Sequence, residues 1–116
     1  MNIEEIREYC IGKPGVTESF PFNDTALVFK AVKIFAILDL SEESRGISLK
    51  CDPIRAEFLH QQHPAVLPGY HMNKRHWNTV VLDGTIADAE IYGMIDDSNA
   101  LVFRDCLKRI GQCHEV

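Results

Sequence analysis

The residues best suited to chemistry in this chain lie between Phe58 and Leu82, a stretch that contains no aspartate or glutamate. At its centre, two histidines, an amide, two cations and the single tryptophan stand close together. This cluster consists of Tyr70, His71, Asn73, Lys74, Arg75, His76 and Trp77. Cations bind phosphates, amides hydrogen-bond to base edges and exposed aromatic rings stack on bases, so the combination suits binding better than bond breaking.

The tryptophan of this cluster has a second interpretation. Trp77, Thr79 and Val81 recur with the two-residue period of a β-strand, which favours a buried position for the indole. Tyr70 follows Pro-Gly and could anchor the loop in the same way. Under this interpretation the two rings position the cations and do not themselves contact a ligand.

Four of the five histidines lie in the same stretch, which raises the question of metal binding. Neither an HExxH motif nor a paired Cys/His motif is present. His60 and His63 are three residues apart on an expected helix, on the face opposite Phe58, so we expect them to face solvent. The sequence therefore predicts neither a metal site nor a cofactor.

A histidine and a carboxylate acting together would be the remaining route to catalysis. His71 or His76 could serve as a base oriented by Asp39, Asp83 or Glu18, but no spacing selects one pair. No nucleophile elbow, glycine-rich phosphate loop or kinase-type motif is present. We therefore expect a binding protein and not an enzyme.

Composition bounds the class of protein. With 116 residues, of which 46% are hydrophobic, we expect one domain spanning residues 1–116. No apolar run is long enough to span a membrane and no signal peptide opens the chain, which predicts a cytoplasmic protein. The scattered cysteines predict reduced thiols, mostly in the core. They are Cys10, Cys51, Cys106 and Cys113.

Overall charge argues against a protein that coats nucleic acid. The formal net charge is -5, and all 17 acids lie outside the stretch from Phe58 to Leu82. Any contact with DNA must therefore be local.

The first half of the chain predicts a helix followed by strands. Asn2, with Glu5 three residues later, gives a capping-box pattern ahead of apolar residues at helical spacing. Segments rich in Val, Ile and Phe then predict strands, with a tight turn near Lys33. The expected strands are Leu27–Val32, Ile34–Leu40 and Ile47–Lys50.

The second half predicts helix, strand and helix. Asp52 and Pro53 suit the cap and first position of a helix whose buried side we expect to contain Ile54, Phe58 and Leu59. The cluster then lies on a loop that leads into a strand at Trp77–Leu82.

The final helix is expected to start near Ala87 and to break at Ser98, which would cap a new helix. This order predicts an α+β domain, an antiparallel sheet covered by helices on one face.

Several blocks of the chain resemble the MmcQ/YjbR family. They are Val16–Phe22 (VTESFPF), Leu27–Leu38, Ile47–Ala56, Pro68–Gly84 (PGYHMNKRHWNTVVLDG), and Ser98 with Leu101 and Val102. The chain departs from the family at Asn23 and Asp24, where members carry a glycine, and at Asn99, where a tyrosine is frequent.

The resemblance implies a two-layer sandwich similar to the CyaY (frataxin) fold and a DNA-binding protein. The cluster from Tyr70 to Trp77 is the surface it implies, with Lys30, Lys33 and Lys50 as strand cations that could join it. The main alternative is a binding module for an anionic small molecule or a protein partner, because the acidic remainder of the chain repels nucleic acid. The sequence predicts no membrane partner and leaves the oligomeric state open.

Overall fold

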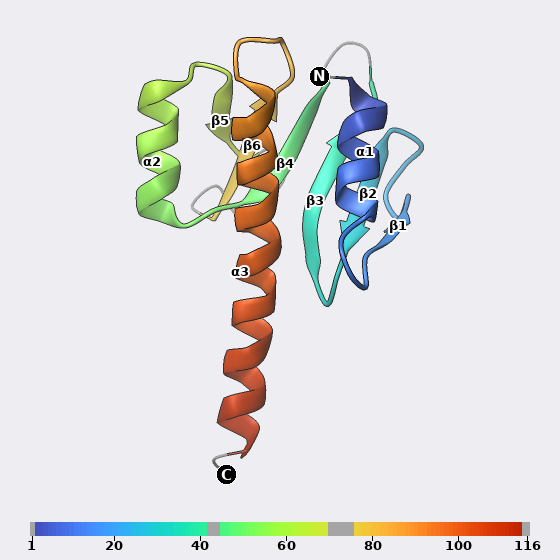
Figure 1. Cartoon of the computed structure of the whole chain (residues 1–116), viewed down its shortest axis with the longest axis vertical. Coiled ribbons are helices and arrows are strands. Elements are labelled where there is room, and N and C mark those ends of the chain that lie inside the picture. Colours follow the sequence, from blue (N-terminus) through green and yellow to red (C-terminus); the bar gives the residue numbers. More distant parts are fainter. Residues whose placement is uncertain (1, 42–44, 70–75, 115–116) are drawn as a thin grey trace.

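A computed structural model describes residues 2–41, 45–69 and 76–114, with side-chain surroundings as far as Arg104. Within these ranges, three helices and six strands follow one another (Figure 1). In order they are α1 (Ile3–Ile11), β1 (Thr17–Ser19), β2 (Ala26–Lys30), β3 (Ile34–Asp39), β4 (Gly46–Lys50), α2 (Pro53–Gln62), β5 (Val66–Pro68), β6 (Trp77–Val81) and α3 (Asp88–His114).

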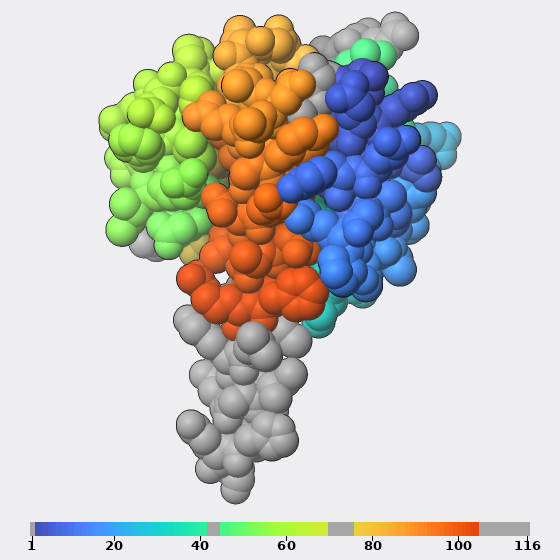
Figure 2. Space-filling view, in the orientation of Figure 1, coloured from blue at the N-terminus to red at the C-terminus, as the bar shows by residue number. Residues whose placement is uncertain are grey.

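The strands form one antiparallel sheet in the order β1-β2-β3-β4-β6-β5. All three helices contribute side chains to one hydrophobic core on a single face of the sheet, and α1 and α3 hide much of that face in Figure 2. The predicted α+β two-layer architecture is confirmed. The sequence missed β1 and β5, which are only three residues long and lie at the two edges.

The helix starts follow the local rules used to predict them. The side chain of Asn2 accepts a hydrogen bond from the Glu5 N–H at 2.8 Å and caps α1. The side chain of Asp52 accepts one from the Ile54 N–H at 3.0 Å, with Pro53 at the first position of α2. Both predicted caps are confirmed.

The predicted buried side of α2 is partly wrong. Ile54 is 83% exposed and Phe58 is 54% exposed, whereas Ala56 and Leu59 are buried. The inward stripe of α2 continues from Leu59 to His60, which reaches Asn78 on β6. Because part of the inward stripe is polar, the apolar residues of the sequence did not mark it.

The predicted break at Ser98 is also wrong, because α3 runs without interruption for 27 residues. Ser98 is fully buried in the middle of the helix. Its hydroxyl accepts a hydrogen bond from the Lys50 N–H at 2.8 Å and donates one to the Phe35 carbonyl at 2.5 Å. The last residue pair of the β3–β4 ladder is Ala36 and Leu49, which are the chain neighbours of Phe35 and Lys50. Ser98 therefore bridges the two strands where their own ladder stops.

The face of the sheet away from the core carries a mixed row of side chains. Register places six residues side by side across all six strands. They are Ser19, Val28, Ile37, Ser48, Thr79 and Leu67. This face is therefore neither a second core nor a uniformly charged surface.

Candidate nucleic-acid interface

The predicted loop is the connection of the β5–β6 hairpin. The Gly69 N–H donates to the Trp77 carbonyl at 2.7 Å, and the Cys51 N–H donates to the His76 carbonyl at 2.8 Å. These bonds fix the residues on either side of the connection. The prediction that the cluster leads into a strand agrees with the start of β6 at Trp77. Five predicted site residues lie outside the described residues. They are Tyr70, His71, Asn73, Lys74 and Arg75.

Trp77 is buried, but it is not part of the main core. Its side chain is 8% exposed and it lies on the sheet face opposite Asn78, which points toward the helices. The backbone of Gly69 packs directly on it, since a Cβ added at Gly69 would lie 2.6 Å from the Trp77 Cβ. Trp77 is therefore buried at the neck of the hairpin, where its Cβ and carbonyl meet Gly69, as the buried interpretation of the sequence predicted, and little of its ring is exposed for stacking.

The sheet brings the predicted lysines to one end. Lys50 ends β4 directly beside Trp77 on β6. Lys30 ends β2, and Lys33 lies in the turn that joins β2 to β3 at the same end. We call Lys30, Lys33, Lys50 and His76 the basic end of the sheet. The residues come from three separate segments, and antiparallel pairing is what brings these segments together.

Carboxylates gather at the opposite end. Asp24 lies in the loop that enters β2, Asp39 ends β3, and Asp83 follows β6. Hydrogen bonds from the Thr85 side chain and N–H hold the pKa of Asp83 below its ordinary value, so this group is ionised at neutral pH. The strand lysines and these three carboxylates therefore lie at opposite ends of the sheet, with Asp52, two residues after Lys50, and Arg45, just before β4, as exceptions at the two ends.

The histidines of α2 face inward, which corrects the expectation that they face solvent. His60 Nε2 lies 2.8 Å from Asn78 Oδ1, and His63 Nε2 lies 3.1 Å from Glu90 Oε2. The His60 ring therefore links α2 to β6, whereas the His63 ring, in the cap that follows α2, lies near Glu90 of α3 without a hydrogen-bond geometry. Over residues 2–41, 45–69 and 76–104, no three His, Cys, Asp or Glu side chains come together as metal ligands.

The catalytic pairings considered from sequence are not assembled by the described part of the chain. His76 is exposed at the basic end, whereas Asp39 and Asp83 lie at the other end of the sheet. Glu18 forms an ion pair with Arg7. His76 is therefore not oriented by any of these three carboxylates.

Two cysteines are buried free thiols, as predicted. Burial raises the pKa of Cys10 to about 12 and also raises the pKa of Cys51. A protonated thiol is a poor nucleophile, so these groups are packing residues at neutral pH. The side chains of Cys106 and Cys113 lie beyond the described ones.

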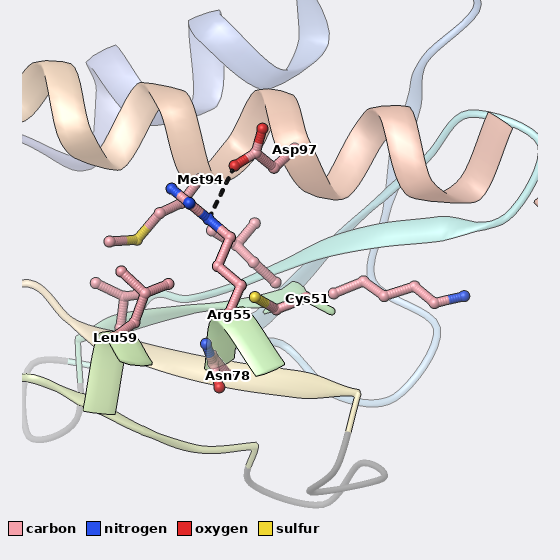
Figure 3. Close-up of a pocket in the computed structure, with 9 residues that line it drawn as sticks. Cys51, Arg55, Leu59, Asn78, Met94 and Asp97 are labelled. Atoms are coloured by element: carbon pink, nitrogen blue, oxygen red, sulfur yellow. Dashed lines mark ion pairs between the residues drawn. The ribbon is translucent and has the colours of Figure 1, made fainter. Parts of the chain in front are cut away.

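Sequence reasoning missed a hollow between α2 and α3. Figure 3 shows Arg55 reaching from α2 to Asp97 on α3, above Cys51 and Asn78. Beneath this pair is a cavity of about 10 Å³, and beside it is a larger open groove of about 330 Å³. No sequence signal marks the groove, because its residues come from two segments, Cys51–Arg55 and Asp97–Arg104, that lie far apart in the sequence.

Comparison with known proteins agrees with the resemblance seen in the sequence. A family model described as YjbR matches residues 11–101. The chain belongs to the YjbR family. Among YjbR relatives, "Uncharacterized protein YjbR" of Escherichia coli K12 is 41% identical over 99 residues, 84% of each chain. "Uncharacterized protein YbdF" of Escherichia coli O157:H7 is 38% identical over 110 residues, 91% of this chain and 88% of that one.

Solved structures share the fold of this YjbR chain. The crystal structure of Deinococcus radiodurans protein DR2400 has a TM-score of 0.82 and 39% identity, and the match covers 87% of this chain and 78% of that one. The crystal structure of a Pseudomonas syringae protein has a TM-score of 0.73 and 29% identity, and the match covers 84% of this chain and 96% of that one. No helix in the described part of the YjbR chain is both long and apolar enough to cross a membrane.

Proposed function

We propose that this YjbR-family protein is a non-enzymatic DNA-binding protein that contacts phosphates at the basic end of its sheet. Lys30, Lys33 and Lys50 supply cations from the described residues. Lys74 and Arg75, between the fixed ends of the β5–β6 connection, add two more from the sequence. Phosphate contact fixes position on DNA and carries no base information.

The observation that supports the proposal is that Lys30, Lys33 and Lys50 gather at one end of the sheet, where the nearby carboxylates are engaged, since Asp52 caps α2 and Glu18 pairs with Arg7. A net charge of -5 would repel DNA if it were spread evenly. Strands of five or six residues are about 17–20 Å long, whereas the screening length at physiological ionic strength is about 8 Å. A phosphate at the basic end is therefore largely screened from the carboxylates at the other end.

The same geometry sets the strength and type of binding. Two to five neutralised phosphates predict a slope of log K against log salt between about -2 and about -5, which corresponds to weak, salt-sensitive binding. Since Trp77 is buried, base stacking by this ring adds little. We expect little sequence preference.

Fluorescence anisotropy of a labelled duplex, titrated from low to physiological salt, tests the proposal. We expect binding that weakens with salt and falls strongly in Lys33→Gln/Lys50→Gln and in Lys74→Ala/Arg75→Ala. A control is Arg45→Gln, which removes one cation beside Gly46 at the opposite end of the sheet and should bind nearly as the wild type does, whereas the single variant Lys50→Gln should bind more weakly.

Circular dichroism checks that each variant is folded. An absence of binding at low salt, or an equal loss in the matched control, would show that the basic end is not a DNA site.

A further inference from the structure

The groove between α2 and α3 has the size of a small-molecule site. Its volume is about 330 Å³, at the lower end of the range of ligand pockets. The groove is lined by Cys51, Asp52, Arg55, Asp97, Ala100, Leu101 and Arg104. Charged groups therefore surround an apolar patch formed by Ala100 and Leu101.

The carboxylates of this groove already have partners. Asp52 caps α2 by accepting hydrogen bonds from the N–H groups of Ile54 and Arg55, at 3.0 and 3.5 Å. Asp97 Oδ2 lies 3.4 Å from Arg55 Nε in a half-exposed ion pair. Such pairs are weak, and a guanidinium has further N–H donors, so Arg55 retains capacity for a second acceptor.

Arg104 is the second cation of this groove, and it differs from Arg55 in its partners. It is exposed, and among the described side chains no carboxylate pairs with it. Burial raises the pKa of the neighbouring Cys51 thiol, which keeps it neutral, so it does not repel an anion. Over the side chains described as far as Arg104, the groove therefore offers one guanidinium without a carboxylate partner, a partly engaged one and an apolar surface between charged groups.

We infer that the groove between α2 and α3 binds a small organic monocarboxylate. Arg104 and Arg55 hold the carboxylate, for which the guanidinium fork is well shaped, and the apolar body lies on Ala100 and Leu101. A singly charged ligand fits better than a multiply charged one, because Asp52 and Asp97 balance the two arginines. This site differs in place and in ligand class from the proposed DNA interface.

Titration of the ¹⁵N-labelled protein with benzoate, followed by two-dimensional NMR, tests the inference. We expect saturable shifts at the backbone amides of Ala100 and Leu101. Loss of a charge-assisted contact in Arg104→Gln should weaken binding about tenfold. Asp97→Asn should strengthen it, because this change frees Arg55 and removes a repulsive charge.

Two controls make the outcome decisive. Arg45→Gln removes an equal charge at the far end of the sheet and should leave benzoate affinity unchanged. Benzamide, which has the same ring without the charge, should produce no saturable shifts. Failure to saturate up to the solubility limit of benzoate, equal binding of benzamide, or unchanged affinity in Arg104→Gln would each overturn the inference. DNA binding by Arg104→Gln, measured in parallel, keeps this test separate from that of the proposed function.

Discussion

At the scale of single residues, Ser98 has a role that its local sequence does not indicate. Its hydroxyl is both acceptor and donor between β4 and β3, and through Lys50 it fixes the strand end that supplies a cation to the basic end. Ser98 follows two aspartates within the expected final helix, and serine is a preferred N-cap residue, so its sequence suggests the start of a new helix. Only the packing of α3 on the sheet reveals a structural bridge.

Removal of this hydroxyl should destabilise the fold. Ser98→Ala removes the buried hydroxyl that accepts from the part-buried Lys50 N–H, so we expect a loss of about 1–3 kcal/mol in the free energy of unfolding. Urea denaturation measures it. Ser48→Ala is the control, since its hydroxyl lies on the uncovered face, 3.2 Å from Thr79 Oγ1, and should lose less. Equal losses in the two variants would argue against the bridge.

Asp96 joins α3 to α1. Burial alone would raise its pKa, but hydrogen bonds from Lys13 and Tyr9 hold the pKa of Asp96 below its ordinary value. The same contact raises the pKa of Tyr9 to about 12. A lowered carboxylate pKa means that the stabilisation is present above the ordinary value of 3.8 and is lost as pH falls through the lower folded value.

Asp96→Asn should therefore lower the free energy of unfolding by about 0.5–1 kcal/mol at pH 7, a small value because the ion pair is partly exposed to solvent. The difference should almost vanish at a pH where the wild-type carboxylate is protonated. Denaturation of both proteins across the acid range measures this difference. Asp24→Asn is an exposed control. A gap between wild type and Asp96→Asn that persists at low pH would contradict the assignment.

At the scale of elements, sequence patterns located the long elements and failed at the short ones. The strands β2, β3, β4 and β6 are rich in β-branched and aromatic residues, and their positions were predicted to within one or two residues. The three-residue strands β1 and β5 have too few residues for a pattern, and Pro68 weakens the strand signal further. Both form only because a longer neighbour supplies a paired edge.

Helix α2 gives a direct test of this difference between pattern and packing. Ile54→Gln and Phe58→Gln remove exposed apolar side chains, so we expect changes within about 0.5 kcal/mol. Leu59→Ala empties a buried position, and we expect a loss of about 2–4 kcal/mol. Thermal denaturation of the three variants measures these effects. A large loss in either glutamine variant would restore the sequence-based interpretation.

The neck of the β5–β6 hairpin depends on the absence of a side chain. Gly69→Ala would place a Cβ 2.6 Å from the Trp77 Cβ and 2.8 Å from its carbonyl, so one strand must shift. We expect a loss of about 1–3 kcal/mol. Gly93→Ala, in an open position of α3, should instead stabilise by about 0.5–1 kcal/mol. Thermal shifts of opposite sign are the expected result, and shifts of the same sign would contradict it.

At the scale of the whole molecule, one core unites all the layers. Buried side chains from α1, α2, α3 and the strands form a single cluster, whereas Trp77 is buried on the other face of the sheet. The charge balance of the chain was readable from composition, but its division between two sheet ends was not, because it depends on which loops the topology brings together. The sequence named Lys30, Lys33 and Lys50 as cations that could join the predicted cluster, and strand pairing places all three at the sheet end to which the β5–β6 connection belongs.

A single core predicts a single unfolding transition. Trp77 fluorescence reports on the uncovered face and far-UV circular dichroism reports mainly on the helices of the other layer. We expect the two signals to give the same midpoint in urea. Separate midpoints would show that the β5–β6 hairpin unfolds independently of the helical layer.

The brevity of β1 and β5 has a consequence for the behaviour of the protein at high concentration. An open sheet exposes unpaired N–H and C=O groups along its borders, and these can recruit a strand from another chain. Here each border strand is three residues long, and Pro68 lacks an N–H to donate. A second molecule would gain few bonds by adding to either border, so the native fold resists growth into edge-paired aggregates without a covering loop or helix.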